Sequence, residues 1–178
     1  MKKSLVLFIL SMIFSTQFIS ANPKITPVSG FELSKYLGTW YEIARMPVSF
    51  ERNLVAVTAT YGLQKDGKVS VLNQGHKSSV QGKLKMANGK ARFAGNTDVG
   101  HLKVSFFWPF YADYIIVALD QKDYQYAMVV SEGFKYLWIL SRTPRLDASI
   151  LNGLLDKAKA LGFDVQKLYM VPQEQANS

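Results

Sequence analysis

The sequence predicts an all-β protein: an eight-stranded antiparallel up-and-down barrel with a C-terminal α-helix packed on its outside. Between residues 38 and 142, short alternating runs of β-branched and aromatic residues are separated by turn residues, which is typical of a meander. Gly38 and Trp40 open the first run, and Arg142 ends the last. Because strand side chains alternate faces, Trp40 can point inward, where Arg142 can lie over the indole and close one end of the barrel.

Eight strands follow one another with turn signals between them. They are expected at residues 38–46, 54–65, 68–76, 82–95, 100–107, 113–120, 125–131 and 136–142. The segment 65–68, Lys-Asp-Gly-Lys, indicates a tight hairpin, and residues 120–123 indicate a looser one. Lys83, Lys85, Lys103 and Arg45 alternate with apolar neighbours, which favours a barrel that is charged outside and apolar inside over an outer-membrane barrel.

A helix is expected after the barrel. Asp147 can cap its first turn, and Gly162 can end it. One apolar stripe, which should pack on the barrel, is formed by Ile150, Leu151, Leu154, Leu155, Ala158 and Leu161. Residues 164–171 are then expected to form a short strand that pairs on the barrel edge.

Residues 1–21 are typical of an export signal, because Lys2 and Lys3 precede an apolar run and Ala21 offers a cleavage site. The remainder, residues 22–178, suits a single domain with a sizeable core, since 48% of the chain is hydrophobic. Cysteine is absent, which excludes disulfides, thiolate catalysis and thioether lipidation of this sequence. We therefore expect a soluble periplasmic or secreted protein, with outer-membrane association less favoured.

The net positive charge of the sequence indicates which classes of partner to consider. The formal charge is +8, or 8 − 2 = +6 without the two signal lysines. Such a surface favours anionic phospholipid or nucleic acid. Nucleic acid is not expected as a partner, because the basic residues are scattered and no recognition motif occurs.

Several segments together resemble the lipocalin family, and more narrowly the bacterial lipocalins, relatives of apolipoprotein D. The general signature lies in residues 38–45 (Gly-Thr-Trp-Tyr-Glu-Ile-Ala-Arg) and 140–143 (Leu-Ser-Arg-Thr), and the bacterial feature is Phe-Phe-Trp-Pro-Phe-Tyr at residues 106–111. The resemblance implies a lipocalin fold that binds fatty acids and lysophospholipids in a barrel cavity. It also implies a role in carrying or storing lipids for maintenance of the cell envelope.

Alternation from Trp40 and Arg142, together with apolar character, predicts which residues line the cavity. The expected ligand-binding residues are Glu42, Ala44, Met46, Asn73, Val104, Phe106, Tyr114, Ile116, Met128, Tyr136 and Trp138. The same residues could instead form an ordinary core. Glu42 either binds polar groups of a ligand or is a structural acid held by Asn73, a tyrosine or a water.

The loops opposite Trp40 and Arg142 should form an aromatic and partly basic mouth. They are residues 47–53, 77–81, 108–112 and 132–135, and Arg52, Lys77 or Lys135 could meet a carboxylate or phosphate there. The loop from Trp108 to Ala112 is unusually apolar. It could cover the mouth, form a homodimer or make a peripheral membrane contact.

Evidence for catalysis is poor. His76 and His101 lie in no metal-binding spacing and beside no nucleophile, so no catalytic residue, metal site or cofactor is expected. Two alternatives to a lipid carrier remain: a lipocalin-fold enzyme, and a carrier of haem or another small hydrophobic ligand.

Overall fold

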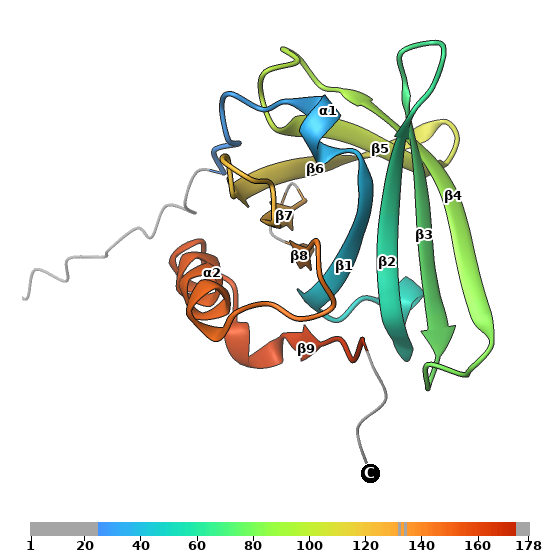
Figure 1. Cartoon of the computed structure of the whole chain (residues 1–178), viewed down its shortest axis with the longest axis vertical. Coiled ribbons are helices and arrows are strands. Elements are labelled where there is room, and N and C mark those ends of the chain that lie inside the picture. The colour runs from blue at the N-terminus through green and yellow to red at the C-terminus, as the bar shows by residue number, and fades with distance from the viewer. Residues whose placement is uncertain (1–24, 132, 134, 174–178) are drawn as a thin grey trace, which may run out of the picture.

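The computed structural model describes residues 25–131, 133 and 135–173, so the expected export signal lies outside the described residues. A nine-stranded sheet curls into a barrel, with helices at its end and on its side (Figure 1). The strands are β1 (Gly38–Arg45), β2 (Leu54–Leu63), β3 (Val69–Lys77), β4 (Leu84–Phe93), β5 (His101–Phe107), β6 (Phe110–Leu119), β7 (Tyr126–Val130), β8 (Leu137–Ser141) and β9 (Tyr169–Met170). The helices are α1 (Leu33–Tyr36), α2 (Ala148–Ala160) and the 3-10 turns η1 (Ser49–Glu51) and η3 (Val165–Lys167).

The first eight strands form a closed antiparallel meander, as predicted. Each strand pairs with the next along the chain, and β1 pairs with both β2 and β8, which closes the barrel. Between β5 and β6 the connection is shorter than expected, because Phe107 pairs with Phe110 directly across Trp108 and Pro109. Successive strands alternate direction, so the connections at 46–53, 78–83, 108–109 and 131–136 share one end of the barrel.

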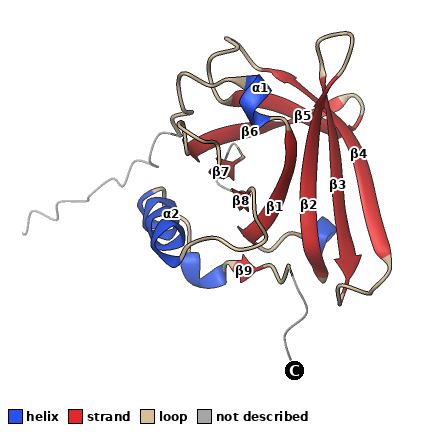
Figure 2. Ribbon diagram, in the orientation of Figure 1, coloured by secondary structure: helices blue, strands red, loops and turns tan. Residues whose placement is uncertain are grey.

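α2 packs outside the barrel, as predicted (Figures 1 and 2). The Asp147 carboxylate caps its first turn by accepting a hydrogen bond of 2.7 Å from the Ser149 backbone N–H. Leu154 and Ala158 are buried against β1, β6, β7 and β8. A strand was expected at residues 164–171, but only the end of this segment is a strand. The 3-10 turn η3 comes first, and β9 follows it and pairs with β1. No helix in the described part of the chain is long and apolar enough to cross a membrane.

Two hydrophobic clusters lie on opposite faces of the sheet. The interior cluster takes side chains from all eight barrel strands, and the exterior cluster joins α2 to one sector of the barrel. The hydroxyls of Tyr61 on β2 and Tyr114 on β6 are 2.8 Å apart, although these strands are not neighbours in the sheet. This contact therefore crosses the barrel interior.

Arg142 and Trp40 close one end of the barrel, as predicted. The guanidinium lies 3.9 Å from the centroid of the indole and donates hydrogen bonds to the backbone carbonyls of Thr39 and Lys35. The indole N–H of Trp40 donates to the Tyr36 carbonyl at 2.8 Å, which holds α1 across the same end. The interior can therefore open only at the opposite end.

Candidate ligand-binding site

A β-bulge in β1 changes which of its residues face the interior. The pairing of β1 with β8 shifts by one residue between Glu42 and Ala44. Glu42 still lies inside, but Ala44 and Met46 pack in the exterior cluster beneath α2, and Arg45 is buried beside Glu42 instead. The inward orientation predicted for Ala44 and Met46 is wrong, as is the outward one for Arg45, because simple alternation assumes an unbroken strand.

Met128 is also placed on the wrong face by the sequence analysis. Its neighbours Ala127 and Val129 belong to the interior cluster, whereas Met128 packs on the outside of β7 beneath α2. Since α2 covers the outer face of this strand, both faces are apolar, and hydrophobicity does not identify the inward one.

The remaining predicted residues meet around the barrel interior, where several of them retain accessible surface. Inside a closed sheet, a side chain that keeps accessible surface must adjoin an open space large enough for a water molecule. The half-buried residues of this kind are Asn73, Val104, Phe106, Tyr114 and Trp138. Ile116, by contrast, is completely buried and fills the closed end rather than lining the space.

Two lysines lie on the inward face at the open end. Ala91 belongs to the interior cluster, and the register of β3 with β4 is unbroken from Val69↔Ala91 to His76↔Leu84. Alternation therefore places Lys85 and Lys77 on the inward face. Lys85 was expected outside, and this expectation is wrong. Tyr136 lies at the same end, with its ring centroid 5.7 Å from that of Trp138.

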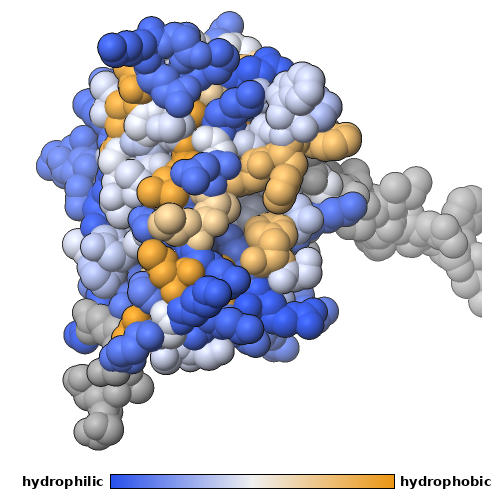
Figure 3. Space-filling view, turned by 90° about the vertical axis from the view of Figure 1, so that its right-hand side faces the viewer, coloured by the Kyte–Doolittle hydropathy of each residue, from blue (hydrophilic) through white to orange (hydrophobic). Residues whose placement is uncertain are grey.

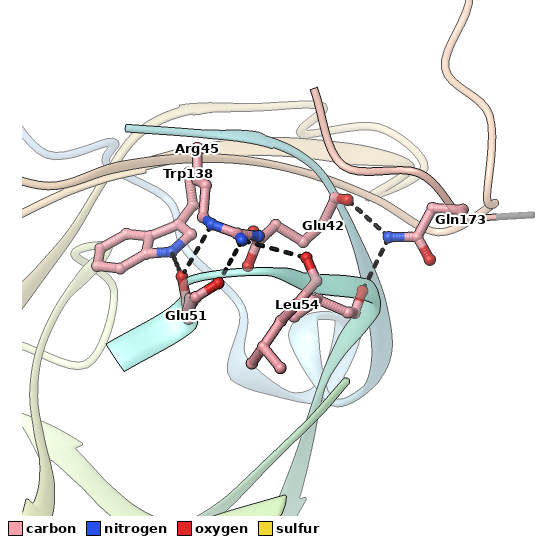
Figure 4. A network of polar contacts seen from close by, with 7 residues as sticks. Glu42, Arg45, Glu51, Leu54, Trp138 and Gln173 are labelled. Atoms are coloured by element: carbon pink, nitrogen blue, oxygen red, sulfur yellow. Dashed lines mark hydrogen bonds and ion pairs between the residues drawn. The ribbon is translucent and has the colours of Figure 1, made fainter. Parts of the chain in front are cut away.

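A buried charged network connects the mouth to the interior (Figure 4). Arg45 Nη1 is 2.5 Å from Glu42 Oε1, and its Nε is 3.5 Å from Glu51 Oε2. Arg45 Nη2 donates to the backbone carbonyls of Glu51 at 2.6 Å and Leu54 at 3.2 Å. The indole N–H of Trp138 donates to Glu51 at 3.3 Å. The network thus fixes η1 and Trp138 at the open end.

Glu42 is a structural acid in this network, and its charged partner is Arg45, which was not among the partners expected from the sequence. All three charged side chains are buried. Burial, and then the neighbouring Glu51 carboxylate, raise the pKa of Glu42 to about 8 against the opposing effect of Arg45. Burial also raises the pKa of Glu51. A proton on Glu42 leaves one carboxylate for one guanidinium, which avoids an excess buried negative charge.

We expect wild-type protein to lose stability relative to a Glu42→Gln variant as the pH rises from about 5 to about 8. The folded-state pKa of Glu42, about 8, lies above its ordinary value of 4.5, so the folded state holds a proton that the unfolded state releases. This contribution is complete below the unfolded pKa and is lost as the pH passes through the folded one. The expected change is about 1 to 3 kcal/mol, measured by urea unfolding of both proteins across the pH range. If the difference changes in the opposite direction, Arg45 lowers the pKa of Glu42 and the assignment is wrong.

Three tyrosines form a hydrogen-bonded chain deeper in the barrel. The Tyr114 hydroxyl lies 2.7 Å from that of Tyr36 and 2.8 Å from that of Tyr61. Burial raises the pKa of all three phenols, so they remain neutral at physiological pH. The three hydroxyls satisfy one another's hydrogen bonds and link the elements that surround the barrel interior without adding a charge.

The histidines lie in different settings. His101 Nε2 is 2.6 Å from an Asp113 carboxylate oxygen, and His76 Nδ1 is 3.0 Å from the Gly82 carbonyl. Within the described residues, no three His, Cys, Asp or Glu side chains are grouped so that they could hold a metal ion.

A surface groove of about 480 Å³ lies between α2 and β6, lined by Val117, Tyr126 and Ile150 among others. It is separate from the barrel interior.

Residues missed by the sequence analysis include Arg45, Glu51 and Ala59. Ala59 pairs with Trp40 on one side and Asn73 on the other, on the interior face. Its pairing with Trp40 could have been anticipated from the position of the first hairpin. The inward orientation of the Arg45 side chain could not be predicted from the sequence, because the residues at the β-bulge that causes it are not of types that indicate a bulge.

Comparison with known proteins identifies the fold family. A family model described as a lipocalin-like domain matches residues 31–173. The chain belongs to the lipocalin family. This lipocalin is 48% identical over 150 residues to the outer membrane lipoprotein Blc of Vibrio cholerae, covering 84% of the chain and 87% of that relative. It is 46% identical over 149 residues to the Blc protein of Escherichia coli K12, covering 84% and 83%. Mouse apolipoprotein D is 33% identical over 154 residues, covering 83% and 78%. The predicted resemblance is confirmed.

Solved structures agree on the architecture. Insecticyanin of the tobacco hornworm Manduca sexta superposes on this lipocalin with a TM-score of 0.70 at 23% identity, covering 87% of each chain. Apocrustacyanin C1 superposes with a TM-score of 0.65 at 20% identity, covering 82% and 81%. These likenesses establish the fold alone. Family membership, together with the Blc relatives, supports binding of a small hydrophobic ligand.

Proposed function

We propose that this lipocalin binds a fatty acid or a lysophospholipid in its barrel and carries or stores it for maintenance of the cell envelope. The observation that carries the proposal is an apolar interior closed at one end. Val104, Phe106 and Trp138 pack against the interior cluster but are only half-buried, while Trp40 and Arg142 close the opposite end. Such a space suits an elongated apolar chain that enters from one side.

The energetics favour an acyl chain. Each buried methylene gains about 0.8 kcal/mol, so about ten of them gain roughly 8 kcal/mol before the costs of association and chain ordering. Micromolar or somewhat tighter binding is the expected net result.

The head group is proposed to stay at the mouth. Lys77 and Lys85 are exposed on the inward face of the open end, where a carboxylate or a phosphate can meet them without leaving water. The buried carboxyls of Glu42 and Glu51 are both paired with Arg45. A ligand with its tail inward and its anionic head outward therefore meets matching chemistry at both ends.

The envelope role rests on the relatives and on the start of the chain. Both Blc relatives described above bear the name outer membrane lipoprotein. This sequence contains no cysteine, which thioether lipidation requires. We therefore propose an exported protein that acts in the periplasm or outside the cell without that modification.

Mass spectrometry of organic extracts from protein purified without detergent tests the proposal, with fatty acids or lysophospholipids as the expected species. Titration of delipidated protein with a lysophospholipid should then change the tryptophan fluorescence. Because Trp138 is half-buried at the interior space, Trp138→Phe should remove most of that change while keeping much of the affinity. The exposed Trp108 provides the matched control, since Trp108→Phe should retain the change. A Soret band with no bound lipid, or an unaltered response in Trp138→Phe, contradicts the proposal.

A further inference from the structure

The hairpin between β5 and β6 exposes three large aromatic side chains within four residues. The exposed fractions are 81% for Phe107, 76% for Trp108 and 77% for Phe110. These side chains therefore do not cover the barrel mouth, which was one of the three interpretations of this segment. The preceding residue, Phe106, packs against the interior cluster. The β5–β6 hairpin therefore has one aromatic ring inside the barrel, and the aromatic rings that follow it are exposed to water. Exposed aromatic groups this close together mark an interaction surface.

Further apolar side chains are exposed on the side of the molecule where the hairpin lies. In Figure 1 it reaches past the edge of β4, and the space-filling view of that side shows apolar side chains gathered in the middle of the face (Figure 3). Leu84 and Met86 on the outside of β4 are also exposed. Exposed apolar side chains thus occur on the outside of β4 as well as at the hairpin.

Charge is distributed unequally between the two ends of the barrel. The connections of the open end and the adjoining strand ends expose Arg52, Lys77, Lys83, Lys85 and Lys135. In the described part of these segments the acidic residue is Glu51, which is buried against Arg45. Connections at the closed end mix both signs, as in Asp66 beside Lys68 and Asp123 beside Lys122. The open end therefore combines exposed aromatics with positive charge.

We propose that the open end docks on a bilayer surface containing anionic phospholipids, with Phe107, Trp108 and Phe110 inserted at the interface. Aromatic rings favour the boundary between head groups and acyl chains, and lysines near an anionic surface add attraction. A symmetric contact between two copies through this end would bring two basic mouths together, which disfavours a second copy as the occupant. In the docked position the barrel mouth faces the lipid, and a ligand tail can move between them with little exposure to water.

Flotation with vesicles tests this docking, using equimolar phosphatidylethanolamine and phosphatidylglycerol, with pure phosphatidylcholine for comparison. Protein without added ligand should bind the anionic vesicles more tightly and release them at high salt. Replacing Phe107, Trp108 and Phe110 together by serine should weaken binding about tenfold or more. Leu63→Ser is the matched control, because Leu63 is 60% exposed at the closed end, and it should bind as wild type does. Lys83→Gln with Lys135→Gln should reduce the preference for anionic vesicles.

Trp108 supplies a second measurement, since its fluorescence should shift to shorter wavelength on vesicles and Trp108→Phe should lose that shift. Ligand affinity of the serine variant, measured without vesicles, distinguishes failure of docking from failure of ligand binding. The proposal is overturned if wild type does not float with anionic vesicles, or if the serine variant and Leu63→Ser behave alike. It is also overturned if the serine changes convert a dimer into a monomer without affecting vesicle binding.

Discussion

Replacing Arg45 with methionine should lower the free energy of unfolding by about 3 to 5 kcal/mol near pH 8. The change leaves Glu42 and Glu51 buried without their cation, and it removes the donor from the carbonyls of Glu51 and Leu54. Near pH 5 the loss should be smaller, because the raised pKa of Glu42, about 8, keeps that carboxyl protonated, and burial shifts the pKa of Glu51 in the same direction. Urea unfolding followed by circular dichroism measures both values.

Arg92→Met is the matched control for this change. Arg92 is exposed on β4 and stacks on Tyr111 at 5.1 Å, so its loss should cost less than about 1 kcal/mol. Combining Arg45→Met with Glu42→Leu and Glu51→Gln should restore much of the stability, because the buried charges are then removed together. If Arg45→Met alone is as stable as Arg92→Met, the network contributes nothing to the fold and our account of it fails.

Replacing Ala59 with tryptophan should reduce lysophospholipid affinity by on the order of fiftyfold. Ala59 faces the interior between Trp40 and Asn73, so a larger side chain there must occupy the proposed ligand space. Displacing about three methylenes forfeits about 2.4 kcal/mol, which corresponds to that loss of affinity. Isothermal titration calorimetry of the delipidated variant provides the measurement, and circular dichroism verifies its fold.

The neighbouring Thr60→Trp is the control for added bulk. Thr60 lies on the opposite face of β2, where its hydroxyl is 3.0 Å from that of Thr39, and the change should leave lipid affinity within about twofold. A folded Ala59→Trp variant with wild-type affinity would exclude the barrel interior as the lipid site, and equal losses in both variants would point to a general distortion of β2.

Much of the fold and of the site was predictable where the local sequence determines which way a side chain points. Trp40, two residues after Gly38, was predicted to point inward because strand side chains alternate faces, and Arg142, at the end of the last strand, was predicted to lie over its indole. Asp147 was predicted as a cap because its side chain accepts hydrogen bonds from N–H groups in the following turn. Trp138 was placed inside correctly because β8 alternates regularly up to Arg142. Val104 and Phe106 were placed inside by their apolar character, on a strand whose other face carries His101, Lys103 and Ser105.

The sequence by itself determined the closed meander, the capped outer helix and the closing contact, since each depends on residue types at short or repeated spacings. Only the tertiary structure decided that Arg45 turns inward while Ala44 and Met46 turn outward, because the bulge in β1 arises from pairing with β8 nearly a hundred residues away. It likewise decided that Met128 faces α2, since a strand buried on both faces has no hydrophobic asymmetry to reveal its orientation. Alternation reports the faces of a strand only while its register is unbroken, and register is a property of two strands together.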